Sequence, residues 1–185
     1  MRSLIVTMVL AVALAGDAYA ETAAPPFFAA FERFCVETNS APKAVQAAVL
    51  AAGGRQFRPW ARTASWTIVI SGREFRISSG VLQAPDPAGP DTLSVSCDVE
   101  SFQNEDPGLA AARAWVGVPK QDASNDTSFE SYAFQQWNGD RAPAPTDKAG
   151  YSAASDRGLI WQLTLTRAAD VAGAQLLHIL GPAPR

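Results

Sequence analysis

The chain has 185 residues, of which 48% are hydrophobic and 18% are charged, and its formal net charge is −3. This balance is typical of a folded globular protein and is too apolar for a disordered one. Mild acidity disfavours nucleic acid as a partner, because nucleic-acid binders need a basic face to neutralise phosphates. With only one histidine and two cysteines, the composition disfavours a zinc cluster, and the sequence indicates no metal site and no cofactor.

The first 20 residues have the pattern of a secretory signal peptide. A positively charged start is followed by an apolar run over residues 4–16 and by a small-residue ending at Ala20. The apolar run is shorter than the roughly 20 residues that a membrane-spanning helix needs. We therefore expect cleavage of residues 1–20, export to the periplasm or beyond, and a mature single domain over residues 21–185 without a membrane span.

The two cysteines, Cys35 and Cys97, both lie in the expected mature chain. In an oxidising compartment such a pair commonly forms one structural disulfide. The closed loop would span 62 residues (97 minus 35), for which chain entropy predicts about 4 kcal/mol of stabilisation. A redox-active pair usually has Cys-x-x-Cys spacing, which is absent here. The spacing therefore favours a structural bond.

Two helices are predicted at the start of the mature chain. Apolar residues at helical spacing predict the first over residues 27–38. Asn39 and Ser40 are expected to cap a second helix, which Pro42 starts and Gly53 ends. A short connection between two helices predicts a helical hairpin.

Alternating apolar and polar residues predict strands over residues 66–70, 75–77, 93–99, 129–137, 159–166 and 176–180, and Asp106-Pro107 predicts the start of a further helix. Short turns between consecutive strands favour antiparallel pairing. The expected fold is α+β, with the N-terminal helical hairpin packed on an antiparallel sheet of about five to six strands and one helix inserted between strands.

A basic cluster follows the second predicted helix. Arg55, Arg58 and Arg62 flank Trp60, and arginines beside an aromatic ring can bind a carboxylate or phosphate of a partner. The alternative is a solvated surface whose charges are balanced by nearby acidic residues.

Residues 138–157 are predicted to form a long irregular segment, because the segment contains two prolines and no clear periodicity. Loops longer than about 15 residues in compact domains often carry function. The segment and the residue before it form a candidate partner-binding loop, whose candidate residues are Trp137, Asp140, Arg141, Lys148 and Tyr151.

The sequence offers little for catalysis. His178 lies within an apolar strand, and the chain has no Gly-x-Ser-x-Gly elbow to supply a nucleophile. Asp98 with Glu100 or Asp91 is a possible carboxylate pair of the kind that cleaves glycosides. We assign no catalytic residue.

The segment Phe31 to Thr38 reads F-x-x-x-C-x-x-T, and a helix rich in small residues follows it. This pattern, just after a signal peptide, resembles that of a group of small exported proteobacterial proteins of uncharacterised function, which carry a second cysteine in a strand. The resemblance implies an exported α+β domain and brings no catalytic residues.

The sequence thus favours a non-catalytic binding or interaction module of the bacterial periplasm or cell envelope, with a protein or a small ligand as its partner. The alternatives are a carrier of a small apolar or amphipathic ligand and a carboxylate-dependent hydrolase. A large internal cavity would favour the carrier, and two carboxylates facing each other in an open cleft would favour the hydrolase.

Overall fold

The computed structural model describes residues 24–60, 63–84, 91–103, 106–121 and 128–183, so the expected signal peptide at residues 1–20 lies outside it. The helices of this part are α1 (Pro26–Phe31), the π-helix η1 (Glu32–Val36), α2 (Pro42–Ala51), α3 (Pro107–Val116) and α4 (Lys148–Asp156). The strands are β1 (Arg55–Trp60), β2 (Thr63–Ile70), β3 (Arg73–Ala84), β4 (Thr92–Ser101), β5 (Phe129–Trp137), β6 (Asp140–Pro143), β7 (Ile160–Arg167) and β8 (Ala172–Pro182). Among these residues no helix has the length and apolar character needed to cross a membrane.

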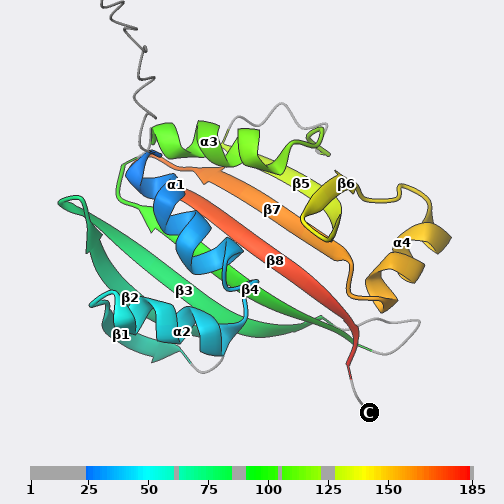
Figure 1. Ribbon diagram of the computed structural model, residues 1–185, viewed down its shortest axis with the longest axis horizontal. Coiled ribbons are helices and arrows are strands. Elements are labelled where there is room, and N and C mark those ends of the chain that lie inside the picture. Colours follow the sequence, from blue (N-terminus) through cyan, green and yellow to red (C-terminus); the bar gives the residue numbers. More distant parts are fainter. Residues whose placement is uncertain (1–23, 61–62, 85–90, 104–105, 122–127, 184–185) are drawn as a thin grey trace, which may run out of the picture.

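The strands form one antiparallel sheet in the order β1-β2-β3-β4-β8-β7-β5-β6, which Figure 1 shows behind α1 and α2. The fold is α+β, as the sequence predicts, but its eight strands exceed the expected five to six. The two missed strands, β1 and β6, are the edges of the sheet. Edge strands are often short, charged or proline-containing, so they lack the alternation that reveals a central strand.

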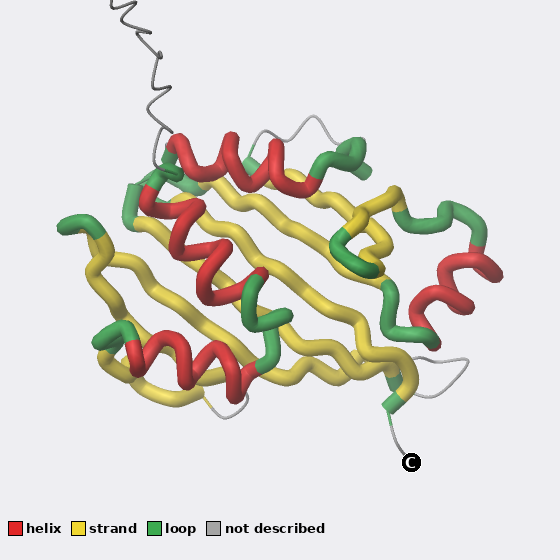
Figure 2. Tube along the Cα trace, viewed as in Figure 1, coloured by secondary structure: helices red, strands yellow, loops and turns green. Residues whose placement is uncertain are grey.

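Helices α1, η1, α2 and α3 pack on one face of the sheet, which we call the covered face (Figure 2). Helix α4 packs on the opposite face, over the small apolar cluster that includes Ile160 and Ile179. The expected single inserted helix is therefore two helices, on opposite faces. We call the rest of the opposite face the uncovered face.

The β2–β3 hairpin follows the predicted alternation. Trp66 and Ile77 are register partners and both are buried on the covered face. The turn at Ser71 and Gly72 has φ angles of 51° and 76°, which suit a two-residue hairpin turn with the twist of the strands. The predicted strand at residues 93–99 is confirmed as part of β4.

The predicted first helix is not a uniform α-helix. After α1, backbone hydrogen bonds join residues that are five apart in the sequence. The Glu37 amide donates to the Glu32 carbonyl at 2.9 Å, and the Ser40 amide donates to the Cys35 carbonyl at 2.8 Å. A π-helix inserts an extra residue into the turn. Apolar spacing alone does not reveal this change, because the buried positions still recur on one side of the helix.

Asn39 and Ser40 do not cap α2, contrary to the expectation. Their φ angles are 52° and 54°, and the N-cap of α2 is Ala41, without a side-chain hydrogen bond. Ser40 is buried instead, and its hydroxyl donates to the Leu176 carbonyl of β8 at 3.1 Å. The turn is thus anchored to the middle of the sheet.

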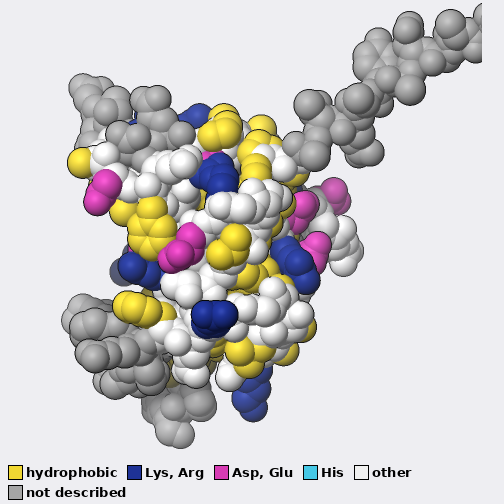
Figure 3. Space-filling view, turned by 90° about the vertical axis from the view of Figure 1, so that its left-hand side faces the viewer, with side chains coloured by type: hydrophobic (Ala, Val, Ile, Leu, Met, Phe, Trp, Pro, Cys, Tyr) yellow, Lys and Arg dark blue, Asp and Glu magenta, His cyan; other side chains and the backbone are white. Residues whose placement is uncertain are grey.

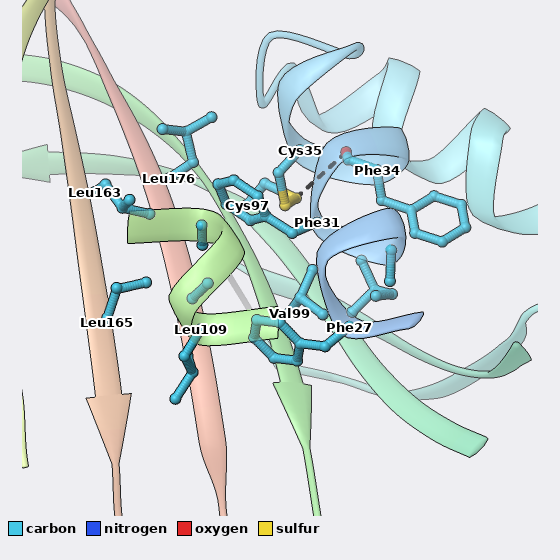
Figure 4. Packing of buried hydrophobic residues seen from close by; sticks show 14 of the residues in the cluster. Phe27, Phe31, Phe34, Cys35, Cys97, Val99, Leu109, Leu163, Leu165 and Leu176 are labelled. Atoms are coloured by element: carbon cyan, nitrogen blue, oxygen red, sulfur yellow. Dashed lines mark hydrogen bonds between the residues drawn. A yellow bond between two sulfur atoms is a disulfide. The ribbon is translucent and has the colours of Figure 1, made fainter. Parts of the chain in front are cut away.

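The predicted disulfide is present between Cys35 of η1 and Cys97 of β4, with a Cα–Cα distance of 5.3 Å. Both residues are fully buried among aromatic and aliphatic side chains, as Figure 4 shows. Cys97 Sγ lies 3.4 Å from the Phe34 carbonyl oxygen; a disulfide sulfur has no proton to donate, so this is a packing contact. The bond fixes the helical layer to the sheet at its centre.

Helix α3 begins where the sequence predicts. Asp106 is its N-cap and accepts a hydrogen bond from the Gly108 amide at 2.8 Å. The Asp106 side chain is fully buried and forms an ion pair with Arg73. Arg73 also donates to Ser101 Oγ at 3.0 Å. These contacts connect the β2–β3 hairpin to the end of β4 and the start of α3.

A second ion pair connects α3 to β5 on the covered face. Arg113 donates to both carboxylate oxygens of Glu130, at 2.8 and 2.6 Å, and the Tyr132 hydroxyl donates to Glu130 at 2.6 Å. The hydrogen bond from Arg113 is the main reason why the pKa of Glu130 is lowered from 4.5 to about 2. This carboxylate is ionised and fully partnered at neutral pH.

Candidate functional site: the uncovered face of the sheet

Polar side chains form a row across the uncovered face, at right angles to the strands. Cross-strand partners in a sheet point to the same side, so the register places one residue from each of seven strands in line. This line begins with Phe57 and continues with six polar residues, which we call the polar row: Ser65, Ser78, Asp98, Gln175, Thr164 and Ser131. Six adjacent strands therefore each present a hydroxyl, carboxylate or amide group.

Most of the polar row is partly exposed, unlike the covered face. Ser78, Asp98, Gln175, Thr164 and Ser131 are all half-buried, whereas Ser65 at the β2 end of the row is buried. In the described part of the chain, α4 is the one helix on this side, and its contacts are with β7 and β8 at the end near Ile160 and Ile179. The row is thus a polar surface that the helices of the described residues leave accessible.

Asp98 is the ionisable residue of the row. Its pKa is raised from 3.8 to about 6, first because burial disfavours the charged form and also because Glu100 lies nearby with the same charge. A side-chain hydrogen bond from Gln175 opposes this shift. Among the described residues, Asp98 forms no ion pair, in contrast to Glu130, which is paired with Arg113.

Beside the row lies an arginine held between two aromatic rings. The Arg76 guanidinium carbon is 5.5 Å from the ring centre of Phe57 and 5.3 Å from that of Phe102. Arg76 also donates to Glu100 at 3.0 Å. Its Nε is buried and has no hydrogen-bond partner. We call these four residues the Arg76 cluster.

The Arg76 cluster exposes apolar surface at the edge of the uncovered face. Phe57 and Phe102 are 48% and 45% exposed, and Val69 on the neighbouring strand is 65% exposed. The end of the molecule that carries the β2–β3 turn shows hydrophobic, basic and acidic side chains intermixed (Figure 3). Exposed aromatic rings next to paired charges are typical of recognition surfaces.

An open groove of about 360 Å³ lies near the same edge, and it contains one of the residues of the predicted anion-binding surface. Its lining includes Arg55 and Glu74, together with residues at the end of α2 and on β2. Arg58 and Trp60 belong to β1, and Arg62 lies outside the described residues. The grouping of the four predicted residues as one site therefore stays a prediction.

The predicted partner-binding loop is not irregular. Residues 138–157 contain β6 and α4. Asn138 and Gly139, with φ angles of 50° and 89°, form the tight turn before β6. Asp147 caps α4 by accepting a hydrogen bond from the Gly150 amide at 2.8 Å. The helix was missed because only a narrow stripe of it is apolar, which leaves little periodic signal.

Of the five residues assigned to that loop, two are used in the fold. Arg141 lies over the Trp115 ring at 3.8 Å and donates to the Trp115 carbonyl at 2.9 Å, near the C-terminal end of α3. Desolvation lowers the pKa of Arg141. The Tyr151 hydroxyl accepts a hydrogen bond from Gln162 at 3.3 Å.

The other three residues, Trp137, Asp140 and Lys148, are exposed. Trp137 and Asp140 are partners in the β5–β6 hairpin, whereas Lys148 begins α4. The hairpin thus places two of the predicted residues together at the sheet edge. Arg141 and Tyr151 point into packed contacts, so the five residues do not form one continuous surface loop.

His178 has a structural environment. Its ring stacks on Trp161 with 3.8 Å between ring centres, and its Nε2 is 2.8 Å from the Gly158 carbonyl oxygen. A carbonyl only accepts, so Nε2 carries the proton in this contact. Burial lowers the pKa of His178. Among the contacts of the described residues, no carboxylate orients this ring as a catalytic triad requires.

The candidate carboxylate pairs have different geometries. Asp98 and Glu100 share the uncovered face, two residues apart on β4, or about 7 Å along the strand. Asp91 lies before β4, about 23 Å from Asp98 by the same spacing, and accepts a hydrogen bond from Gln83 at 2.7 Å. Asp91 with Asp98 is therefore excluded as a catalytic pair by distance. In the described ranges, no group of three or more His, Cys, Asp or Glu residues is placed to hold a metal ion.

No family model, curated protein or solved structure matches this chain. The site was partly visible in the sequence, since the alternation within β4 places Asp98 and Glu100 on one side of the strand. The contributions of Gln175, Thr164 and Ser131 depend on the order of the strands, which the sequence pattern does not give.

Proposed function

We propose that the protein is an exported, non-catalytic binding module that recognises its partner through the uncovered face of the sheet. The observation that carries this proposal is the polar row, in which five adjacent strands, β3, β4, β8, β7 and β5, present partly exposed hydrogen-bonding side chains. Export is supported by the leader pattern of residues 1–20 and by the disulfide.

The packing of the interior favours a binding surface over a carrier cavity. Large side chains of α1, η1 and the sheet are fully buried against one another, among them Phe27, Phe31, Phe34 and Phe75. The groove at the end of α2 is open to solvent and lies at the edge of the sheet. A carried apolar ligand would need an enclosed site lined mainly by apolar residues.

The surroundings of Asp98 and Glu100 favour binding over hydrolysis. A glycosidase needs one protonated and one free carboxylate on opposite sides of the scissile bond. Asp98 has the raised pKa of an acid, but Glu100 is paired with Arg76 on the same strand face. This pair therefore offers hydrogen bonds to a ligand rather than two opposed catalytic groups.

Site-specific photocrosslinking in the native host tests the proposal. The photoreactive residue p-benzoylphenylalanine is placed at Thr164 or Gln175 in the polar row, and at Gln46 on the exposed side of α2 as a matched control. We expect adducts from Thr164 and Gln175 and none from Gln46. Adducts from Gln46 alone, or none from either row position, would contradict the proposal.

A further inference from the structure

We propose that the ligand of the uncovered face is a neutral, hydroxyl-rich oligosaccharide that lies along the polar row. This inference rests on the proposed function. It comes from three properties of the row: its length, its charge and the aromatic rings at its ends.

The length of the row suits an extended chain. Neighbouring strands are about 4.8 Å apart, so the five strands whose row residues are partly exposed span about 19 Å. The groups along this line, from Ser78 to Ser131, offer a donor or an acceptor at every strand. A pyranose ring is about as wide as one strand spacing and presents hydroxyl groups around its rim. A linear oligosaccharide can therefore repeat its hydrogen bonds from strand to strand.

The charge of the face favours a neutral ligand. Arg76 is paired with Glu100, and Asp98, the charged member of the polar row, has no ion pair with another described residue. A polyanion such as a nucleic acid would be repelled by Asp98 and would find no free basic stripe along the row. Asp98 can accept hydrogen bonds from ligand hydroxyls, which would stabilise its charged form as Gln175 already does.

Aromatic rings lie at the two ends of the row, on the same face of the sheet. Phe57 lies at its β1 end and Phe129 lies on β5 beside its other end, 48% and 40% exposed. The apolar C–H faces of sugar rings pack on exposed aromatic rings. A second copy of this chain fits less well, because homodimer interfaces are about 65% apolar and the row between these rings consists of hydroxyl, carboxylate and amide groups.

The test is a titration of the isotope-labelled, disulfide-bonded mature protein with cellohexaose and chitohexaose, followed through backbone amide resonances. Maltohexaose, which is coiled, and glucose are the ligand controls. We expect the largest shifts at Ser78, Asp98 and Gln175. We also expect about tenfold weaker binding in Gln175→Ala and in Phe57→Ala, and unchanged binding in the matched variant Gln46→Ala.

The dispersion of each variant's spectrum shows whether that variant is folded. Gln175→Ala and Phe57→Ala change different strands, so each tests the inference separately. Absence of shifts with every hexasaccharide at millimolar concentration would overturn the inference, as would shifts confined to the helices. If Thr164 and Gln175 then crosslink to a protein in the host, the binding face stands and only its ligand class is wrong. If neither position crosslinks, the proposed function fails as well.

Discussion

Two carboxylates, Glu130 and Asp98, point to opposite faces of the same sheet and have opposite electrostatic settings. Glu130 on the covered face accepts three hydrogen bonds, two of them from Arg113, and its pKa falls to about 2. Asp98 on the uncovered face has Gln175 as its donor and Glu100 as a like-charged neighbour, and its pKa rises to about 6.

This difference indicates that Glu130 serves the stability of the fold and that Asp98 is suited to ligand recognition. On the covered face, the ion pairs of Arg113 with Glu130 and of Arg73 with Asp106 each join two elements. Ionised Asp98 instead opposes folding, because burial disfavours its charge and no described residue forms an ion pair with it. A ligand that donates hydrogen bonds to Asp98 would recover this free energy on binding, whereas Glu130 has no such capacity left.

The largest expected effect comes from releasing the helices of the covered face from the sheet. Replacing both cysteines in Cys35→Ala/Cys97→Ala should lower the free energy of unfolding by about 4 kcal/mol, because the disulfide closes a loop with a sequence separation of 62. Urea unfolding of the mature protein measures it. A loss below about 1 kcal/mol would show that burial of the aromatic helix, and not the disulfide, holds the helical layer in place.

Glu130→Gln removes the charge that Arg113 and Tyr132 contact, and should lower the free energy of unfolding at pH 7 by about 2 kcal/mol. The folded-state pKa of Glu130 is below its unfolded value of 4.5. Its stabilisation is therefore present above pH 4.5 and is lost as the pH falls towards 2. The matched variant Glu100→Gln breaks a more exposed ion pair and should cost less than about 1 kcal/mol. Equal losses in the two variants would contradict the distinction between the faces.

Asp98→Asn should raise the free energy of unfolding, whereas Glu130→Gln lowers it. The folded-state pKa of Asp98 is above its unfolded value of 3.8, so the native protein binds this proton more tightly. Its contribution to stability is highest below pH 3.8 and is lost as the pH rises through about 6. We expect the variant to be about 1 to 2 kcal/mol more stable than the parent at pH 8 and equal to it at pH 3.5, since partial exposure reduces the effect.

Urea unfolding at both pH values provides the measurement for Asp98→Asn. The side-chain amide that this substitution introduces keeps an acceptor for Gln175, so the variant removes the charge without removing the hydrogen bond. Destabilisation of the variant at pH 8 would mean that the Asp98 charge supports the fold.

The smallest expected changes in the free energy of unfolding come from substitutions of two adjacent serines of β3. Ser79 is buried on the covered face and its hydroxyl donates to the Ser96 carbonyl at 2.8 Å. Ser78 belongs to the polar row and shares a 2.8 Å hydrogen bond with Ser65. We expect Ser79→Ala to cost about 1 kcal/mol and Ser78→Ala less than about 0.5 kcal/mol. A larger loss from Ser78→Ala would indicate that the row is structural.

The central strands could be predicted from the sequence because each of them buries one face and exposes the other. Residues 93–99 alternate clearly, and the same alternation shows that Asp98 and Glu100 point to one side of β4. Asp106 and Pro107 likewise mark the start of α3 correctly, because cap and proline act locally.

The elements that the pattern missed are those whose form depends on distant partners. The apolar residues of the π-helix η1 have helical spacing, and only its backbone hydrogen bonds between residues five apart show the wider turn. The sequence around Arg141 indicates an exposed loop arginine, whereas in the structure its side chain donates to the Trp115 carbonyl of α3. The polar row depends on the order of six strands, including β8 between β4 and β7, and no local sequence pattern contains that order.

The most direct test of the binding face is carbodiimide labelling of carboxylates, compared between the protein in the intact cell envelope and the purified mature protein. Residue-resolved mass spectrometry gives the extent of labelling at each carboxylate. Glu32 and Glu37, exposed on the helical side, are the internal controls. We predict that Asp98 and Glu100 are labelled less in the envelope than after purification, while the two controls are labelled equally. Equal labelling of Asp98 and Glu100 in both states, or protection of Glu32 and Glu37 instead, would contradict recognition through the uncovered face.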